Sequence, residues 1–245
     1  DLNSPRSVGG SMSVTVNVRD GVYDESFILG AISGNSYVNT LTIKGESGDS
    51  SLVTLSHGNT TTFIVFDLSY LKGLKLQHMS FYSDEGYAMN SVFNLSNCDS
   101  VEISNCSFST AYGTTVDKLN LNNSHGVYVH DNNFNSRISI YLGSDSRHVY
   151  VRIIDNTGLA CYHGGVIQTN SSGTGTYRCI FKGNEGGMYR GNARLFSPSS
   201  STYSIDTLEI IGNNINQEHT STNAYYLSEI YFQSNDYVIF KNNKI

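Results

Sequence analysis

Short stretches in which apolar and polar residues alternate recur along the chain. A polar corner follows each stretch. In most cases a large apolar residue lies three positions after the corner. Clear examples are VEISNCSF (101–108), VYVHDNNF (127–134) and LEIIGNNI (208–215). Alternation with a period of two predicts strands with one buried and one exposed face. Because no helical spacing of apolar residues is sustained, we expect a protein built from short strands.

The polar corner recurs at a nearly constant interval. In the clearest segments each corner lies 25 to 30 residues after the one before it, about 27 on average. These corners fall at His78, Asn105, Asp131, Asn156, Asn184, Gly212 and Asn242. Looser segments place earlier corners at Asp20 and Gly45. The sequence therefore contains about nine repeats, which is typical of a solenoid.

Repeats of this length, with strands and no helix, predict a parallel β-helix. Each strand of such a coil pairs with its counterpart one turn away, about 4.8 Å along the axis. Stacked corner residues can exchange hydrogen bonds and tolerate a left-handed bend. We expect one structural ladder formed by Asn105, Asp131, Asn156, Asn184 and Asn242. We also expect a single all-β domain over residues 1–245 and, from its abrupt ends, a fragment of a longer chain.

The charge of the chain is sparse and slightly acidic. Fifteen Lys and Arg residues stand against 21 Asp and Glu residues, which gives a net charge of −6 with 15% charged residues. This balance disfavours a nucleic-acid surface or a polybasic membrane anchor. The sequence has no apolar run of about eighteen residues, the length a membrane span requires, and no secretion signal at its start.

The cysteines do not show the close pairs that are typical of zinc sites. They are Cys98, Cys106, Cys161 and Cys179. An even number permits two disulfides in an oxidising compartment, and buried free thiols are the equal alternative. We expect neither a bound metal ion nor a cofactor.

The segment 16–56 resembles the opening of right-handed parallel β-helix regions in large secreted or surface proteins of Bacteroidota. The matching positions are Val16, Val18, Gly21, Tyr23, Glu25 and Ile28, and the end YVIFKNNKI (237–245) is similar to the recurring rung of that family. The resemblance implies a right-handed coil, an extracellular or cell-surface location and export by the type IX system. It leaves the function open, because such regions occur in adhesins and in polysaccharide-degrading enzymes.

One candidate catalytic set lies one position before three successive corners. It consists of Ser104, His130 and Asp155. Stacked turns would bring these residues onto neighbouring rungs in the order of a nucleophile, a base and an orienting acid. The alternative is that Ser, His and Asp are common polar choices at exposed positions beside a corner.

A second candidate row follows six or seven positions after the corners. Its glycan-binding candidates are Tyr112, Arg137, Tyr162, His163, Arg190 and His219. Tyrosine rings stack on sugars, and arginine donates hydrogen bonds to hydroxyl and carboxylate groups. The row would also suit lyase chemistry on a uronic acid, which needs a cation and a base. The alternative is an ordinary solvated face.

The sequence favours a non-catalytic stalk or adhesive, glycan-binding module at the cell surface. The paired carboxylates of β-helix glycosidases are not apparent, because the adjacent acids Asp84 and Glu85 would point to opposite faces of a strand. The alternative is a polysaccharide lyase or glycoside hydrolase that acts on an extended glycan along one face. Expected partners are a polysaccharide, a host or neighbouring cell surface and the rest of a longer chain, without nucleic acid or a membrane span.

Overall fold

The computed structural model describes most of the repeats and the strands within them. It covers residues 13–24, 27–57, 64–83, 91–110, 117–134, 138–142, 149–161, 164–169, 176–188, 193–198, 204–217 and 235–244. Within these ranges every regular element is a β-strand. None of the described segments forms a helix with the length and apolarity that a membrane crossing requires.

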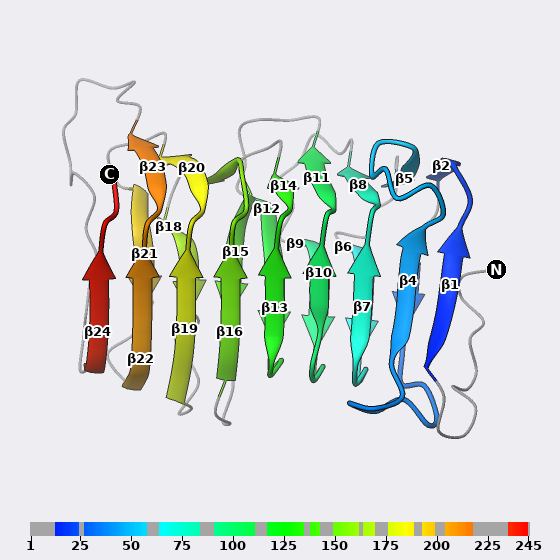
Figure 1. The fold of residues 1–245 in the computed structure, drawn as a ribbon, viewed down its shortest axis with the longest axis horizontal. Helices are drawn as coiled ribbons and strands as arrows, with labels where there is room; N and C mark the ends of the chain where they lie inside the picture. The colour runs from blue at the N-terminus through cyan, green and yellow to red at the C-terminus, as the bar shows by residue number, and fades with distance from the viewer. Residues whose placement is uncertain are drawn as a thin grey trace.

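The largest sheet has nine parallel strands that lie side by side across the front of the molecule in Figure 1. In spatial order they are β1 (Val14–Val18), β4 (Leu41–Gly45), β7 (Leu74–Gln77), β10 (Glu102–Ser104), β13 (Val127–His130), β16 (Val149–Ile154), β19 (Thr176–Lys182), β22 (Ser204–Ile211) and β24 (Asn235–Lys241). Each strand is thus paired with its counterpart from the neighbouring repeats, as the 27-residue period predicts.

Three further parallel sheets complete the coil. A five-stranded sheet contains β2 (Gly21–Asp24), β5 (Val53–His57), β8 (Ser80–Ser83), β11 (Ser107–Thr110) and β14 (Asn133–Phe134). A three-stranded sheet contains β17 (Leu159–Cys161), β20 (Glu185–Met188) and β23 (Asn214–Gln217). A seven-stranded sheet contains β3 (Phe27–Leu29), β6 (Ile64–Ser69), β9 (Ser91–Ser96), β12 (Asp117–Asn122), β15 (Ile138–Leu142), β18 (Gly164–Thr169) and β21 (Ala193–Pro198).

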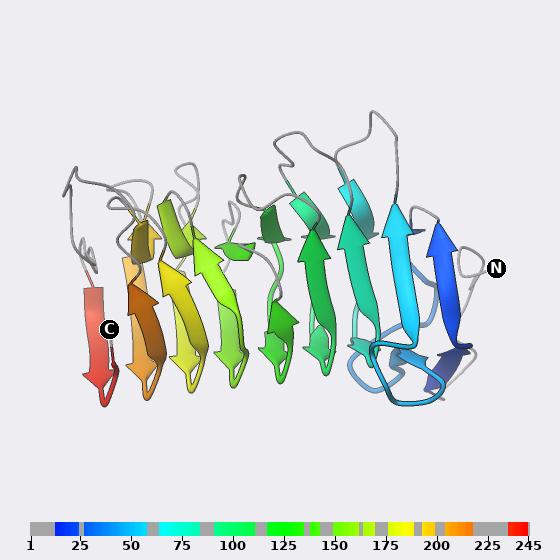
Figure 2. The same cartoon turned by 90° about the horizontal axis from the view of Figure 1, so that it is seen from above.

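The chain is a right-handed parallel β-helix, which confirms the predicted fold class. In Figure 1 the strands of the nine-stranded sheet run upward, the seven-stranded sheet lies behind them, and the chain advances from right to left. A chain that ascends at the front, returns at the back and advances from right to left forms a right-handed coil. Figure 2, seen from above, shows the repeats following one another along the axis of the rod.

The core lies inside the coil, where residues with the same position in successive repeats stack. Leu74, Val127 and Leu208 belong to one such inward column and are at most 1% exposed. The five-stranded sheet adds a stack of rings in which the centroids of Phe81 and Phe108, and of Phe108 and Phe134, are each 5.0 Å apart. The phenylalanine three positions after the corners at His78, Asn105 and Asp131 therefore supplies part of the core.

The corner after the nine-stranded sheet consists of two columns, not the single predicted ladder. Residues with a left-handed backbone form the first column: His78, Asn105, Asp131, Asp155, Gly183, Gly212 and Asn242, with φ between 53° and 66°. His78 and Gly183 are half-buried and the others are exposed. The second column follows one residue later and points inward. Asn156 and Asn184 belong to this second column and are fully buried. The predicted ladder joined members of both columns, because it was displaced by one residue in two repeats.

The inward column forms a continuous hydrogen-bonded ladder. Asn156 Nδ2 donates to Asn184 Oδ1 at 2.9 Å, and Asn184 Nδ2 donates to Asn213 Oδ1 at 3.0 Å. Asn132 and Asn243 extend the ladder in the two directions. Each side chain also donates to a carbonyl of a preceding rung, as Asn184 does to Ile153 at 2.9 Å. The ladder therefore satisfies the polar groups of a tight corner inside the coil.

Three of the four cysteines are buried free thiols. Cys98, Cys106 and Cys179 form no disulfide. Burial raises the pKa of Cys98 to about 11 and the pKa of Cys106 and Cys179 to about 12. They pack as small apolar side chains, which was one of the two predicted alternatives. Cys161 is part of β17, and its side chain lies outside the described structure.

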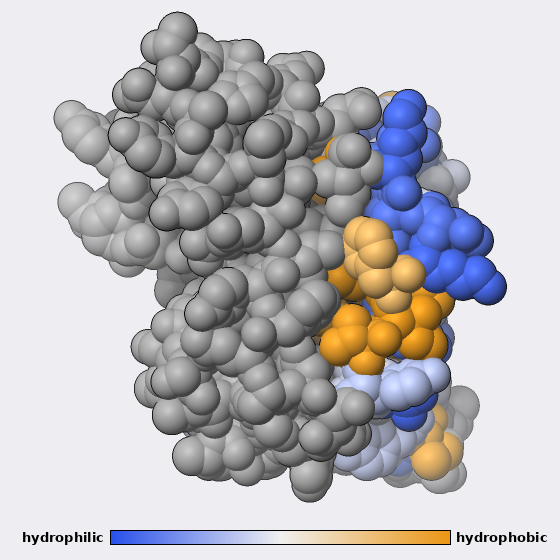
Figure 3. Space-filling view, turned by 90° about the vertical axis from the view of Figure 1, so that its left-hand side faces the viewer, coloured by the Kyte–Doolittle hydropathy of each residue, from blue (hydrophilic) through white to orange (hydrophobic). Residues whose placement is uncertain are grey.

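The last described rung leaves part of its apolar surface open. Phe240 continues an inward column yet is 48% exposed, and Tyr237 is 57% exposed. Within the described residues, no strand pairs with the far edge of β24. Figure 3, which faces this end of the coil, shows hydrophobic residues between hydrophilic ones.

Candidate functional site

The outward side of the nine-stranded sheet, here called the outer face, carries most of the candidate chemistry. Its outward positions hold six of the fifteen Lys and Arg residues: Lys44, Lys75, Arg152, Arg178, Lys182 and Lys241. Glu102 and Glu209 are the acidic residues that pair in register at outward positions of this sheet. At the described outward positions that pair in register, six cations therefore stand against two anions, in a chain whose net charge is −6.

Aromatic and cationic side chains alternate across the middle of the outer face. The Tyr128 ring stacks with the His130 ring, 3.9 Å away centroid to centroid, and the Arg152 guanidinium carbon lies 4.1 Å from the Tyr128 centroid. The Tyr150 ring lies between Arg152 at 5.7 Å and Arg178 at 5.3 Å. Stacking on the rings orients both guanidinium groups and leaves their N–H edges available to an anion.

Glu102 lies next to this row and is held by donors from both neighbouring rungs. Its Oε2 accepts the Lys75 ammonium at 2.9 Å, and its Oε1 accepts Gln77 Nε2 at 3.3 Å. On the other side, His130 Nε2 is 3.5 Å from Glu102 Oε1. Partial burial by itself raises the pKa of the Glu102 carboxyl, but the hydrogen bond and charge of Lys75, together with His130, outweigh it and lower that pKa.

His130 connects Glu102 to a second carboxylate. Its Nδ1 is 2.6 Å from Asp131 Oδ2, because the left-handed backbone of Asp131 turns that side chain back toward the outer face. The 3.5 Å contact from Nε2 to Glu102 Oε1 is within ion-pair distance, but the buried Nε2 makes no regular hydrogen bond within the described structure. Buried polar atoms without a partner are rare. This atom marks the Glu102–His130 contact as the candidate reaction centre.

The structure separates the members of the predicted Ser104, His130 and Asp155 set. Ser104 pairs with His130 in register, but Ser104 is 1% exposed and its hydroxyl accepts Gln77 Nε2 at 3.2 Å. Ile154, not Asp155, pairs with His130. The acid that orients His130 is Asp131. The prediction failed here because 24 residues, not 25, separate the left-handed corners at Asp131 and Asp155.

The predicted glycan-binding row lies outside the described residues. Its members are Tyr112, Arg137, Tyr162, His163, Arg190 and His219. The row therefore stays a prediction.

Sequence reasoning missed the residues that the outer face brings together. Lys75, Glu102 and Tyr128 occupy the outward position between two inward aliphatic residues, where the residue type varies from repeat to repeat. Aligning this one position across the repeats gives Lys75, Glu102, Tyr128 and Arg152 on consecutive rungs. That alignment is the signal in the sequence that identifies the cluster.

The described residues were also compared with the requirements of a metal centre. In the ranges that the structure describes, no three His, Cys, Asp or Glu side chains converge as ligands of one ion would.

Comparisons with known proteins concern the fold. No protein-family model and no curated protein matches the chain. Similar solved structures include the pectin methylesterase from Aspergillus niger in deglycosylated form, which is 16% identical, with 96% of this chain and 77% of that chain covered and a TM-score of 0.46. The pectin methylesterase of the rice weevil is 13% identical, with 99% and 84% covered and a TM-score of 0.49.

These comparisons correct the functional prediction that the sequence favoured. The three similar structures are all named as pectin methylesterases, including a second form of the Aspergillus niger enzyme at 15% identity and a TM-score of 0.45. The expectation of a non-catalytic stalk or adhesive module is therefore contradicted. The carbohydrate-active alternative has to be judged on the residues of the outer face.

Proposed function

We propose that this protein is a carbohydrate-active enzyme that acts on an acidic polysaccharide lying along the outer face. The observation that carries the proposal is the buried Nε2 of His130, which makes no regular hydrogen bond and lies 3.5 Å from the Glu102 carboxylate. A buried polar group that lacks a hydrogen bond raises the free energy of the free protein, and a ligand that supplies the bond removes this cost. Such groups are therefore common at reactive sites. Glu102 is the reacting carboxylate in this proposal, and His130, oriented by Asp131, is its partner.

The substrate class follows from the cations around this centre. Lys75 lies one rung before Glu102, and Arg152 lies two rungs after it, so the cations span about 14 Å at 4.8 Å per rung. Guanidinium and ammonium groups bind carboxylates through charge-assisted hydrogen bonds. A polymer with carboxylates along its length would contact several of these cations at once. Tyr128 and Tyr150 orient the guanidinium groups, because Arg152 lies over the Tyr128 ring and Arg178 over the Tyr150 ring.

The protonation state of Glu102 limits its role. Its lowered pKa keeps the carboxyl ionised at neutral pH, so it suits a nucleophile or a proton acceptor rather than a proton donor. Hydrolysis would consume water and release a new end group. Elimination would leave an unsaturated sugar at the new end without consuming water. The products distinguish these two reactions.

The test is incubation of the protein with polygalacturonate, its methyl ester, alginate and a neutral dextran. Reducing ends, unsaturated ends and released methanol are measured separately. We expect product from at least one acidic polymer and none from dextran. Glu102→Gln should lower kcat about 100-fold or more, as loss of a reacting group does. Glu209→Gln is the matched control, because Glu209 occupies the same outward column four rungs away from Glu102.

Two results would reject this proposal. Full activity of Glu102→Gln would show that Glu102 takes no part in the reaction. Failure of every acidic polymer to bind or react would show that acidic polysaccharides are not the substrate. Arg152→Ala provides a further check, because it should raise KM more than it lowers kcat if the guanidinium binds the polymer.

We further propose that the protein acts outside the cell, where polysaccharides of this length are found. This location is supported by the resemblance of residues 16–56 to secreted β-helix regions. The Bacteroidota origin and the type IX export route rest on the same resemblance. Fractionation of producing cells, with detection of the protein in the medium or on the surface, tests the location.

A further inference from the structure

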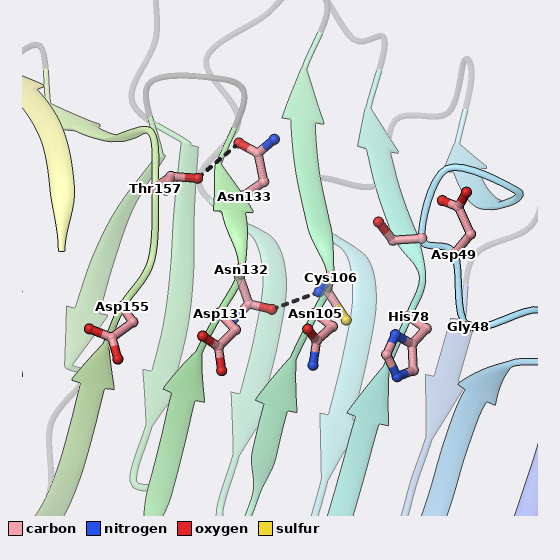
Figure 4. A pocket seen from close by; sticks show the side chains of 11 residues that line it. Gly48, Asp49, His78, Asn105, Cys106, Asp131, Asn132, Asn133, Asp155 and Thr157 are labelled. Atoms are coloured by element: carbon pink, nitrogen blue, oxygen red, sulfur yellow. Dashed lines mark hydrogen bonds between the residues drawn. The ribbon is translucent and has the colours of Figure 1, made fainter. Parts of the chain in front are cut away.

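A polar groove runs along the corner next to the outer face. It has a volume of about 670 Å³ and is lined by residues from the left-handed column and its neighbours: Asp49, His78, Asn105, Asp131, Asp155 and Thr157 are the ones used here. Figure 4 shows His78, Asn105, Asp131 and Asp155 in a row across four successive rungs. Three rung spacings of about 4.8 Å give this row a length of about 14 Å.

The groove exists because the corners differ in length. Only two residues separate β7 from β8, β10 from β11 and β13 from β14. Seven residues, 46–52, separate β4 from β5. The long loop carries Asp49 and stands beside His78 at one end of the row (Figure 4). At the other end, Thr157 Oγ1 contacts Asn133 Oδ1 at 3.4 Å.

The lining offers groups that bind hydroxyls. Carboxylates accept hydrogen bonds, and amide and hydroxyl side chains both donate and accept them. The side chains of Asn105 and His78 form no hydrogen bond with another described residue. Asp155 lies over Gly183, where a Cβ would clash with its carboxylate. Asn105 and His78 therefore offer unused hydrogen-bonding groups to the groove. Asp131, Asp49 and Thr157 line it as well, although each already pairs with one neighbour: His130, Ser51 and Asn133.

The charge of the groove is opposite to that of the outer face. Asp49, Asp131 and Asp155 line it, and no Lys or Arg is among its lining residues in the described structure. Three carboxylates would repel a uronic acid, while the cations on the outer face attract one. A homopolymer of uronic acid therefore fits the outer face but not the groove.

We propose that the groove binds a neutral sugar unit of the polysaccharide whose acidic units bind the outer face. The proposal rests on the proposed function and narrows its substrate class to heteropolysaccharides that combine neutral and acidic sugars. Asp131 belongs to both surfaces, since it orients His130 and lines the groove. One polymer can thus contact the cationic row and the groove at the same time.

The test uses two variants that remove groove groups without straining the backbone. Asn105→Gly removes the amide and keeps a residue suited to φ of 53°. Thr157→Val removes the hydroxyl and keeps the shape. Asn242→Gly is the matched control, because Asn242 is exposed, has φ of 55° and belongs to the same column outside the groove. Binding is measured by calorimetry with rhamnogalacturonan oligosaccharides, polygalacturonate oligosaccharides of equal charge and neutral galactan oligosaccharides.

We expect the mixed oligosaccharide to bind more tightly than the uronate homopolymer. The double variant Asn105→Gly with Thr157→Val should lower the affinity for the mixed oligosaccharide about tenfold, which corresponds to the loss of one or two net hydrogen bonds. Its affinity for the uronate homopolymer should stay unchanged. Asn242→Gly should alter neither. Equal affinity for both acidic ligands, or no effect of the double variant, would overturn the groove proposal and leave the proposed function intact. Failure of both acidic ligands to bind while galactan binds through Asn105 would overturn the proposed function and the mixed polymer as ligand, leaving the groove as a site for neutral sugars alone. Failure of all three ligands to bind would overturn both proposals entirely.

Discussion

At the scale of single residues, two neighbouring corner positions have opposite roles. The first, such as Asn105, bends the backbone and faces solvent. The second, such as Asn184, faces inward and is 0% exposed. Both positions favour asparagine, but for different reasons: tolerance of the left-handed region at the first, and hydrogen bonding along the stack at the second.

Replacement of a ladder residue should cost far more stability than replacement of a bend residue. Asn184 Oδ1 accepts the Asn156 backbone N–H at 3.0 Å and its side-chain amide at 2.9 Å. Asn184→Ala leaves the buried Asn156 backbone N–H unpaired and removes one of the three acceptors of its side-chain amide. We therefore expect the free energy of unfolding to fall by about 2–4 kcal/mol. Asn105→Gly should change it by less than about 0.5 kcal/mol. Urea denaturation of both variants measures the difference, and equal losses would contradict the separate roles.

The charge state of Glu102 predicts a pH dependence of stability. Its pKa is lower in the folded protein than the ordinary value of 4.5, so its contacts stabilise the fold above that value. The contribution should disappear as the pH falls through the folded pKa. The thermal unfolding temperature of the wild type should therefore fall more steeply than that of Glu102→Gln as the pH is lowered from neutral to acidic. Glu209→Gln should follow the wild type, and identical profiles for all three proteins would contradict the stabilised carboxylate.

At the scale of elements, a strand in this coil is stabilised mainly by its counterparts in the neighbouring repeats. β8, β11 and β14 each contribute one phenylalanine to the ring stack, and Phe108 lies between the other two. Phe108→Ala would leave a cavity with a ring on either side, and we expect a loss of about 3–5 kcal/mol in the free energy of unfolding. The control is Val22→Ala in β2, because Val22 is 76% exposed. Loss of less than about 1 kcal/mol for Phe108→Ala would show that the stack collapses around the gap.

The sequence predicted these elements well because the repeat imposes the same pattern on each turn. Inward aliphatic residues and the phenylalanine after the corner identify the strands and their parallel pairing. The candidate site was harder to predict, because its contacts join different rungs and depend on the register to within one residue. DNN in one repeat and IDN in the next allow Asp131 to be aligned with Asn156 or with Asp155. The geometry selects Asp155, and Asp131 then becomes the partner of His130.

At the scale of the whole molecule, the rod carries separated charge. The outer face has an excess of positive charge, the adjacent groove is acidic, and the chain as a whole is at −6. A parallel β-helix can maintain such stripes because equal positions of successive repeats stack about 4.8 Å apart. Two binding strips of opposite sign can therefore run side by side along one rod, and net charge alone gives a poor guide to the ligand.

The charge stripe predicts how binding of an acidic polysaccharide depends on individual lysines and on salt. Lys182 is exposed on the outer face, two rungs beyond His130, whereas Lys72 is exposed at a corner away from it. Lys182→Glu and Lys72→Glu change the net charge equally, so only their positions differ. We expect Lys182→Glu to weaken polygalacturonate binding about threefold to tenfold at low salt and Lys72→Glu to leave it nearly unchanged, because exposed charges act over about 10 Å at 0.1 M salt. The difference should shrink as sodium chloride is added and the charges are screened. Calorimetric titrations of both variants at several salt concentrations provide the measurement, and an equal effect of both substitutions would show that net charge, rather than the stripe, attracts the polymer.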